Sequence, residues 1–152
     1  MIQLRDTVFI EAPPEKVWAW LCHLPDHYQE WHPAHVRCWY ERGDTLEVGA
    51  VLRVEEELHG RPHRLKLRAT DVVANRLLQY SSWGLRGAFI LEESDGGTRV
   101  TALVAFGVEA PLIGRIADGV LARAFATRLA AVREHMREEG QNLKRLLERE
   151  AA

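Results

Sequence analysis

Residues 112–148 read LIGRIADGVLARAFATRLAAVREHMREEGQNLKRLLE, and this stretch decides the fold. Charged residues alternate there with apolar residues that recur at the spacing of one helix face. The apolar set is Ile113, Ile116, Val120, Ala124, Phe125, Leu129, Val132, Met136, Leu143 and Leu147. Pro111 precedes it, at a position where the first turn of a helix tolerates a missing N–H group. The pattern predicts one long amphipathic helix whose apolar face needs a partner surface.

Two polar residues interrupt the apolar face of this helix. His135 and Glu139 are one turn apart, where Met136 and Leu143 predict burial. Gly140 follows in mid-helix, which costs about 1 kcal/mol relative to alanine and therefore marks a bend or a close approach. Either this pair faces the core and needs partners there, or it forms an ordinary solvated i,i+4 pair.

Composition limits the class of protein. The chain has 152 residues, 47% of them hydrophobic, which suits a single domain over residues 1–150. A net charge of -2 argues against nucleic-acid binding, and no apolar run is long enough to span a membrane. The N-terminus does not resemble a signal peptide. Cys22 and Cys38 form no disulfide framework, so we expect reduced thiols in a cytoplasmic protein.

Alternating and helical patterns follow one another along the rest of the chain. Residues 3–11 predict a strand, Pro14 begins a short helix, and residues 25–33 predict a second short helix. Further strands are expected over residues 36–41, 48–59, 63–73, 77–82, 88–93 and 99–106, with turn residues between them. Strands joined by tight turns form an antiparallel sheet, so the expected class is α+β, with the long helix packed on the concave face of the sheet.

The beginning of the chain resembles a known family. Ile10, Ala12, Pro13, Val17 and Trp18 match the I-x-A-P-x-x-x-V-W pattern at the start of the SRPBCC or START-like superfamily, also called polyketide cyclase and Bet v 1-like. The resemblance covers nearly the whole chain. It implies a helix-grip fold, in which a curved antiparallel sheet of about six to seven strands surrounds a long C-terminal helix and encloses a cavity.

Further polar residues are expected on the inner face of the sheet. In the strand over residues 48–59, Glu56 shares a face with Leu52, Val54 and Leu58, where a carboxylate must be paired, protonated or bound to a metal. The same counting places His63 on the inner side of the next strand. For Glu56, pairing with a buried arginine such as Arg128 is the alternative explanation.

A histidine pair lies between the second short helix and the next strand. His32 and His35 flank Pro33 there, and in a helix-grip fold this junction lies at the cavity mouth. His35 could simply terminate the helix. Together, however, His35, Glu56, His135 and Glu139 offer imidazole and carboxylate ligands from three separate elements. This set predicts a site for zinc or another divalent metal.

A second resemblance concerns the same residues. The zinc-dependent diacetylphloroglucinol hydrolase family carries a P-x-H histidine, an inward glutamate and an H-x-x-x-E pair, to which His35, Glu56, and His135 with Glu139 are similar. The resemblance implies metal-assisted hydrolysis of an aromatic ketone or ester, with His63 or His32 moving protons. The chain lacks that family's N-terminal extension and has no histidine between His63 and His135.

Two other functions compete with a metal-dependent hydrolase. One is a non-catalytic module that binds or carries a small hydrophobic ligand, aromatic or polyketide-like, without a metal. The other is a partner-binding protein that uses the helix tail Gln141–Glu150, and a homodimer is compatible with all three.

Two further sets of residues are compatible with the hypothesis of a ligand-binding cavity. The five tryptophans are interpreted as core or cavity lining, and the glycine-containing segment over residues 107–120 as a mobile lip over the cavity.

Overall fold

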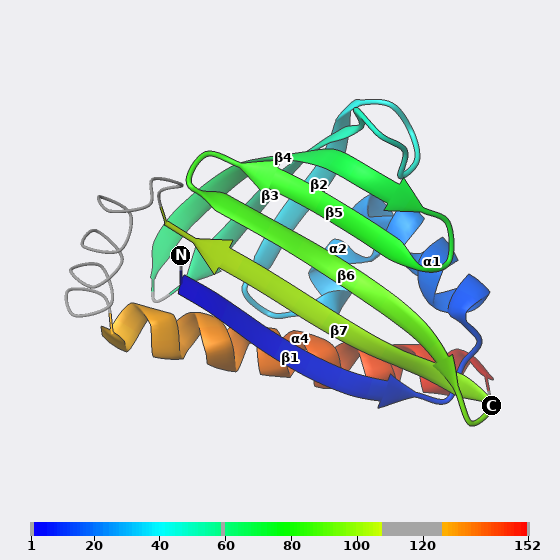
Figure 1. Cartoon of the computed structure of the whole chain (residues 1–152). Coiled ribbons are helices and arrows are strands. Elements are labelled where there is room, and N and C mark those ends of the chain that lie inside the picture. Colours follow the sequence, from blue (N-terminus) through cyan, green and yellow to red (C-terminus); the bar gives the residue numbers. More distant parts are fainter. Residues whose placement is uncertain (1, 59, 108–125, 152) are drawn as a thin grey trace.

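A computed structural model describes residues 2–58, 60–107 and 126–151, and it shows a curved sheet wrapped around a helix (Figure 1). The elements are β1 (Ile2–Ile10), α1 (Pro14–Cys22), α2 (Leu24–Trp31), β2 (His35–Arg42), β3 (Val51–Leu58), β4 (Arg61–Val73), β5 (Leu77–Ser82), β6 (Leu85–Ser94), β7 (Gly97–Phe106) and α4 (Ala126–Ala151). This order confirms the α+β helix-grip fold expected from the sequence.

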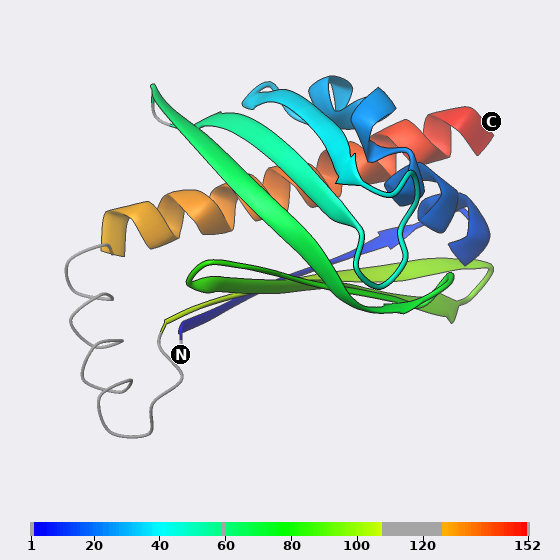
Figure 2. The same cartoon turned by 90° about the horizontal axis from the view of Figure 1, so that it is seen from above.

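All seven strands belong to one antiparallel sheet with the order β1-β7-β6-β5-β4-β3-β2. Tight turns connect the consecutive strands from β3 to β7, as the sequence predicts. In the β6–β7 turn, Asp95 and Gly96 both have positive φ, of 44° and 81°, which is the geometry of a two-residue hairpin turn. The sheet curves so that α4 lies across its concave face (Figure 2).

The C-terminal half of α4 carries the core contacts. Leu143 and Leu147 are 1% and 0% exposed and belong to the same apolar cluster as Ile10 and Val17. A Cβ atom on Gly140 would lie 2.8 Å from the Asp6 carboxylate of β1. The mid-helix glycine therefore marks a close approach of α4 to β1, one of the two roles expected for it.

Helix α2 is attached to α4 by two reciprocal hydrogen bonds. The Trp31 indole N–H donates to the backbone carbonyl of Glu139 at 2.9 Å, and the Asn142 amide donates to the backbone carbonyl of Trp31 at 2.9 Å. These bonds bring the end of α2, and with it the start of β2, against the middle of α4. This contact determines where the predicted histidines meet.

The part of the predicted helix over residues 112–125 and most of the predicted lip over residues 107–120 lie outside the described residues. The five tryptophans are not all interior, because Trp39 is 36% and Trp83 is 99% exposed, so the interpretation as core or cavity lining is wrong for these two. In the tail Gln141–Glu150, Leu143 and Leu147 are buried in the core and Leu146 is partly buried against it, so the polar side of the tail is the side left for a partner.

We expect Leu147→Ala to lower the free energy of unfolding by about 2–5 kcal/mol, because it removes a fully buried side chain and leaves a cavity. Urea denaturation followed by circular dichroism measures this change. Gln141→Ala, on the exposed side of the same helix, is the control and should change stability by less than about 0.5 kcal/mol. Equal effects of the two substitutions would contradict the packing of α4 described above.

Candidate functional site

A cavity of about 320 Å³ lies between the concave face of the sheet, α2 and the first described turns of α4. Most of its wall is aliphatic or aromatic and includes Leu52, Val54, Leu65, Leu67, Leu78, Phe89 and Met136. Polar side chains line the wall as well, among them Glu56, His135 and Glu139. The cavity therefore combines a large apolar wall with a small polar region, which is the usual composition of a small-molecule site.

The four residues predicted as metal ligands meet at this polar region. His35 Nε2 lies 3.1 Å from Glu139 Oε2, 3.4 Å from His135 Nε2 and 3.9 Å from Glu56 Oε1. His135 Nε2 lies 3.4 Å from Glu139 Oε1. The residues come from β2, β3 and α4, so the convergence is a product of the fold and not of sequence proximity. His135 and Glu139 face the interior and do not form a solvated pair.

Helix α2 fixes the orientation of His35. The backbone carbonyl of Tyr28 accepts a 2.9 Å hydrogen bond from His35 Nδ1, so this nitrogen carries the proton and Nε2 presents its lone pair to the cluster. The Tyr28 ring also stacks on the imidazole at a centroid distance of 3.9 Å. The His35 side chain is fully buried and can hardly turn away.

Tyr28 also binds Glu56, and the sequence analysis did not identify this tyrosine as a partner of the carboxylate. Its hydroxyl donates a 2.5 Å hydrogen bond to Glu56 Oε1. Burial and the neighbouring Glu56 carboxylate raise the pKa of Tyr28, so the phenol stays protonated and remains a donor. The inward carboxylate is therefore hydrogen-bonded to a tyrosine from α2.

Burial shifts the protonation of the cluster. It lowers the pKa of His35 to about 4 and also lowers the pKa of His135, despite the opposing effects of Glu56 on the first and Glu139 on the second. Burial likewise raises the pKa of Glu139 to about 8, only partly offset by His135. Near neutral pH the two imidazoles are therefore neutral and the Glu139 carboxyl holds a proton, which it would release on binding a cation.

His32 is buried beside the cluster but both of its ring nitrogens are engaged. Nδ1 accepts a 2.9 Å hydrogen bond from the backbone N–H of Ala34, so Nε2 carries the proton that is donated to Glu138 at 2.8 Å. Nitrogen atoms of His32, His35 and His135 lie within 4.8 Å of one another and could hold a metal ion as a group. To bind a metal ion, His32 would have to lose one of its two hydrogen bonds, to Ala34 or to Glu138.

His63 lies on the inner side of β4, as expected, but not in the cluster. It pairs in register with Glu56 and lines the cavity, while its side chain is exposed at the rim. The structure gives His63 no hydrogen bond to any residue in the described part of the chain. Its position suits contact with a ligand entering the cavity.

Tyr80 is a further cavity residue that the sequence analysis missed. Its ring lies over Gly87 of the neighbouring strand, where an added Cβ atom would be 2.2 Å from the tyrosine Cζ. Burial, Glu139 and Glu56 together raise the pKa of Tyr80, so its hydroxyl stays protonated. Within the described ranges this hydroxyl has no hydrogen-bond partner. The alternation of Leu78 and Tyr80 along β5 would have placed it inside.

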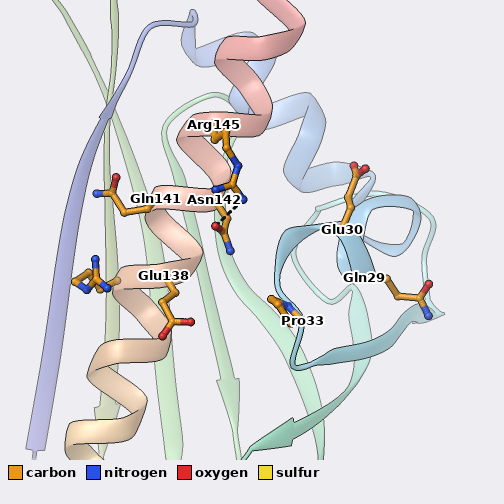
Figure 3. A pocket seen from close by; sticks show the side chains of 8 residues that line it. Gln29, Glu30, Pro33, Glu138, Gln141, Asn142 and Arg145 are labelled. Carbon is orange, nitrogen blue, oxygen red and sulfur yellow. Dashed lines mark hydrogen bonds between the residues drawn. The ribbon is translucent and has the colours of Figure 1, made fainter.

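A second, more polar cleft of about 470 Å³ lies outside the cavity, between α2, the start of β2 and α4 (Figure 3). Its lining consists of Gln29, Glu30, Pro33, Arg137, Glu138, Gln141, Asn142 and Arg145. None of the predicted site residues lines it. Glu138 connects the two regions, because it lines this cleft and binds His32.

Comparisons with known proteins agree with this architecture. A family model described as polyketide cyclase / dehydrase and lipid transport matches residues 1–148. The chain has no match among curated proteins.

Solved structures of similar fold have low sequence identity to the chain. The ZhuI aromatase/cyclase from Streptomyces sp. R1128 superposes with a TM-score of 0.76 at 17% identity, covering 99% of this chain and 96% of the other. The protein TTHA0849 from Thermus thermophilus gives 0.74 at 14% identity, with 99% and 100% coverage. Ara h 8.0201 gives 0.62 at 15% identity, with 96% and 97% coverage. These likenesses support the fold alone.

For the metal-free protein we expect stability to fall between about pH 6.5 and pH 8. The pKa of Glu139 is about 8 when folded against 4.5 as its ordinary value, so the folded state keeps a proton that the unfolded state releases, and each rise in pH favours unfolding. The loss is at most about 1.4 kcal/mol per pH unit. His35, with a pKa of about 4 when folded and 6.5 ordinarily, opposes this trend only below pH 6.5.

Urea titrations at half-unit pH steps, in the presence of a chelator, measure this slope. Glu139→Gln should flatten it, whereas Glu134→Gln, on the exposed side of the same helix, should leave it unchanged. An unchanged slope in Glu139→Gln would show that the carboxyl titrates normally.

Proposed function

Because this chain belongs to the polyketide cyclase, dehydrase and lipid-transport family, we propose that it binds an apolar small molecule, aromatic or polyketide-like, in the cavity between α4 and the sheet. The observation that carries this proposal is the largely aliphatic and aromatic wall around about 320 Å³ of space. A cavity of this size, at the lower end of the usual range for small-molecule sites, suits a ligand of one or a few rings.

The polar groups of the cavity would orient such a ligand. The apolar part would contact the leucines of β3 and β4, and an oxygen atom of the ligand would face the cluster of Glu56, His135 and Glu139. Tyr80 presents a protonated hydroxyl there and can donate a hydrogen bond to that oxygen. A binding module of this kind needs no metal.

A second candidate function is favoured by the convergence of four donor residues. Tetrahedral zinc with ligands at about 2.0–2.1 Å separates neighbouring ligand atoms by about 3.3–3.4 Å. The separations of 3.1, 3.4 and 3.4 Å among His35, His135 and Glu139 are close to this spacing, with one Glu139 oxygen facing each imidazole. Glu56 Oε1 lies farther away, 3.9 Å from His35 Nε2. Neutral imidazoles and carboxylates are also suitable ligands for zinc. The donor set therefore fits a divalent ion.

In this second candidate the protein would be a metal-dependent hydrolase for an aromatic ketone or ester. A divalent ion supplies Lewis acidity and lowers the pKa of bound water. The residues of the chain have separate tasks. Tyr28 orients His35 and Glu56 from behind, as partners of metal ligands commonly do. Tyr80 can bind the ligand oxygen, and the apolar wall excludes bulk water.

The binding proposal is tested with N-phenyl-1-naphthylamine, an uncharged probe whose fluorescence increases in apolar surroundings. We expect the wild-type protein to bind it and Ala69→Phe, which fills the cavity wall, to weaken binding by at least about tenfold, or about 1.4 kcal/mol. Ala74→Phe makes the same change in an exposed turn and should bind like the wild type. Failure of the wild type to bind apolar probes of this size would refute the proposal.

The metal proposal is tested by zinc titration and elemental analysis of the untagged protein. We expect about one zinc per chain, lost in His135→Ala and in Glu139→Gln, because each removes one of about four ligands. His23→Ala removes an exposed histidine remote from the cluster and should retain the metal. Full zinc content in His135→Ala would remove that residue from the ligand set, and a metal-free wild type would leave only the binding function.

A further inference from the structure

Trp83 is an unusual residue because its side chain is 99% exposed. It forms the β5–β6 turn with Gly84, whose φ of +69° suits a tight hairpin. The turn itself needs no indole. A tryptophan that packs against nothing contributes little to folding, while its apolar ring and single N–H group suit the boundary between water and an apolar phase.

The strand register places Trp83 at one end of the cavity. Phe106, the last residue of β7, pairs with Leu85 directly after this turn and with Ile2 at the start of β1. Leu58, Leu85 and Phe106 all line this end of the cavity. We call it the turn end. Figure 2 shows that the end of β3, the start of β4, the β5–β6 turn and the first described residues of α4 lie at this end, while α1 lies at the other end.

Positive charge gathers at the turn end although the chain as a whole carries a net charge of -2. Exposed arginines lie on three of the elements that reach it, Arg5 on β1, Arg61 and Arg64 on β4, and Arg133 on α4. Arg64 is 80% exposed, and its pairing with Glu55 is long, at 3.5 Å. Asp6, Glu55, Glu57 and Glu134 are acidic residues of the same end.

The opposite end carries charges of both signs. Its acidic residues lie in α1, after β1 and around the β6–β7 turn and include Glu11, Glu15, Glu92, Glu93 and Asp95, and its basic residues include Lys16, Arg76 and Arg99. The attraction of an anionic surface for the turn end therefore depends on the arginines of that end.

We propose that the turn end docks on an anionic lipid bilayer, with Trp83 inserted at the level of the headgroups and with Arg61, Arg64 and neighbouring arginines against lipid phosphates and carboxylates. Docking of this kind places the cavity against the phase in which an apolar ligand dissolves. That last consequence rests on the proposed binding function, whereas the docking rests only on Trp83 and the charge distribution. The protein does not need to span the bilayer, and no helix in the described ranges combines the necessary length and apolar composition.

A bilayer suits this surface better than a protein partner does. Stable protein interfaces need about 800 Å² of contiguous, complementary surface on each side. At the turn end, Trp83 and the arginines lie on separate strand ends and turns. Among the described residues of these segments, Trp83 is the one aromatic residue with a largely exposed side chain. A fluid membrane surface accepts isolated projections, and each arginine near an anionic bilayer contributes about fivefold to partitioning.

Co-sedimentation of the full chain with vesicles tests the proposal. We expect binding to phosphatidylcholine vesicles with about 30% phosphatidylserine to exceed binding to pure phosphatidylcholine by at least about tenfold, and to weaken in 1 M salt. Trp83→Ala should reduce binding by at least about fivefold, and the Arg61→Glu/Arg64→Glu double variant by more than about tenfold.

Two matched controls change the same properties at the opposite end. Val48→Ser removes a 65% exposed apolar side chain, and Arg76→Glu reverses an exposed charge; both should bind vesicles like the wild type. No vesicle binding by the wild type, or equal binding by Trp83→Ala, would overturn the docking proposal.

The naphthylamine titration without vesicles separates this outcome from failure of the cavity function. Trp83→Ala lies outside the cavity wall and should keep the probe affinity of the wild type. Wild-type probe binding together with absent vesicle binding would reject the docking and retain the ligand-binding function.

Discussion

The contact between α4 and the concave face of the sheet is the interaction on which the rest of the structure depends. Leu143 and Leu147 are buried completely in the C-terminal half of the helix, and the absence of a side chain at Gly140 lets α4 approach β1 closely. Nearer the N-terminal end of the helix, its inner face carries His135, Met136 and Glu139, which line the cavity. The same helix therefore closes the core at one end and lines the cavity at the other.

The polar cluster inside this wall opposes folding in the metal-free state. Glu139 must hold a proton near neutral pH and His35 must remain neutral, because burial disfavours both charged forms. Protein stability is small enough for such groups to lower it noticeably. Two hydrogen bonds between Tyr28 and its neighbours, together with the Trp31 contact to α4, keep the donors in place at the junction of three elements.

Much of this architecture was predictable because it depends on local periodicity. Alternation along β3 placed Glu56 on the inner face, and the i,i+4 spacing placed His135 and Glu139 together on the core side of α4. Such reasoning does not reach contacts that are not local. The partners of His32, Ala34 at Nδ1 and Glu138 at Nε2, appear only in the tertiary structure. Trp83 was interpreted as interior, although its turn projects into solvent.

The sequence by itself determined the order of strands and helices and the inward positions of Glu56, His135 and Glu139, since these follow from side-chain spacing along one segment, whereas His35 joined the donor set through the family resemblance. Only the tertiary structure decided that His35 Nε2 meets Glu139 at 3.1 Å, that Tyr28 holds Glu56, and that the Tyr80 ring lies over Gly87. It also decided that Trp83 and the arginines share one end of the molecule. Such distances depend on sheet curvature and on how α2 packs against α4, which couple residues as much as about a hundred positions apart.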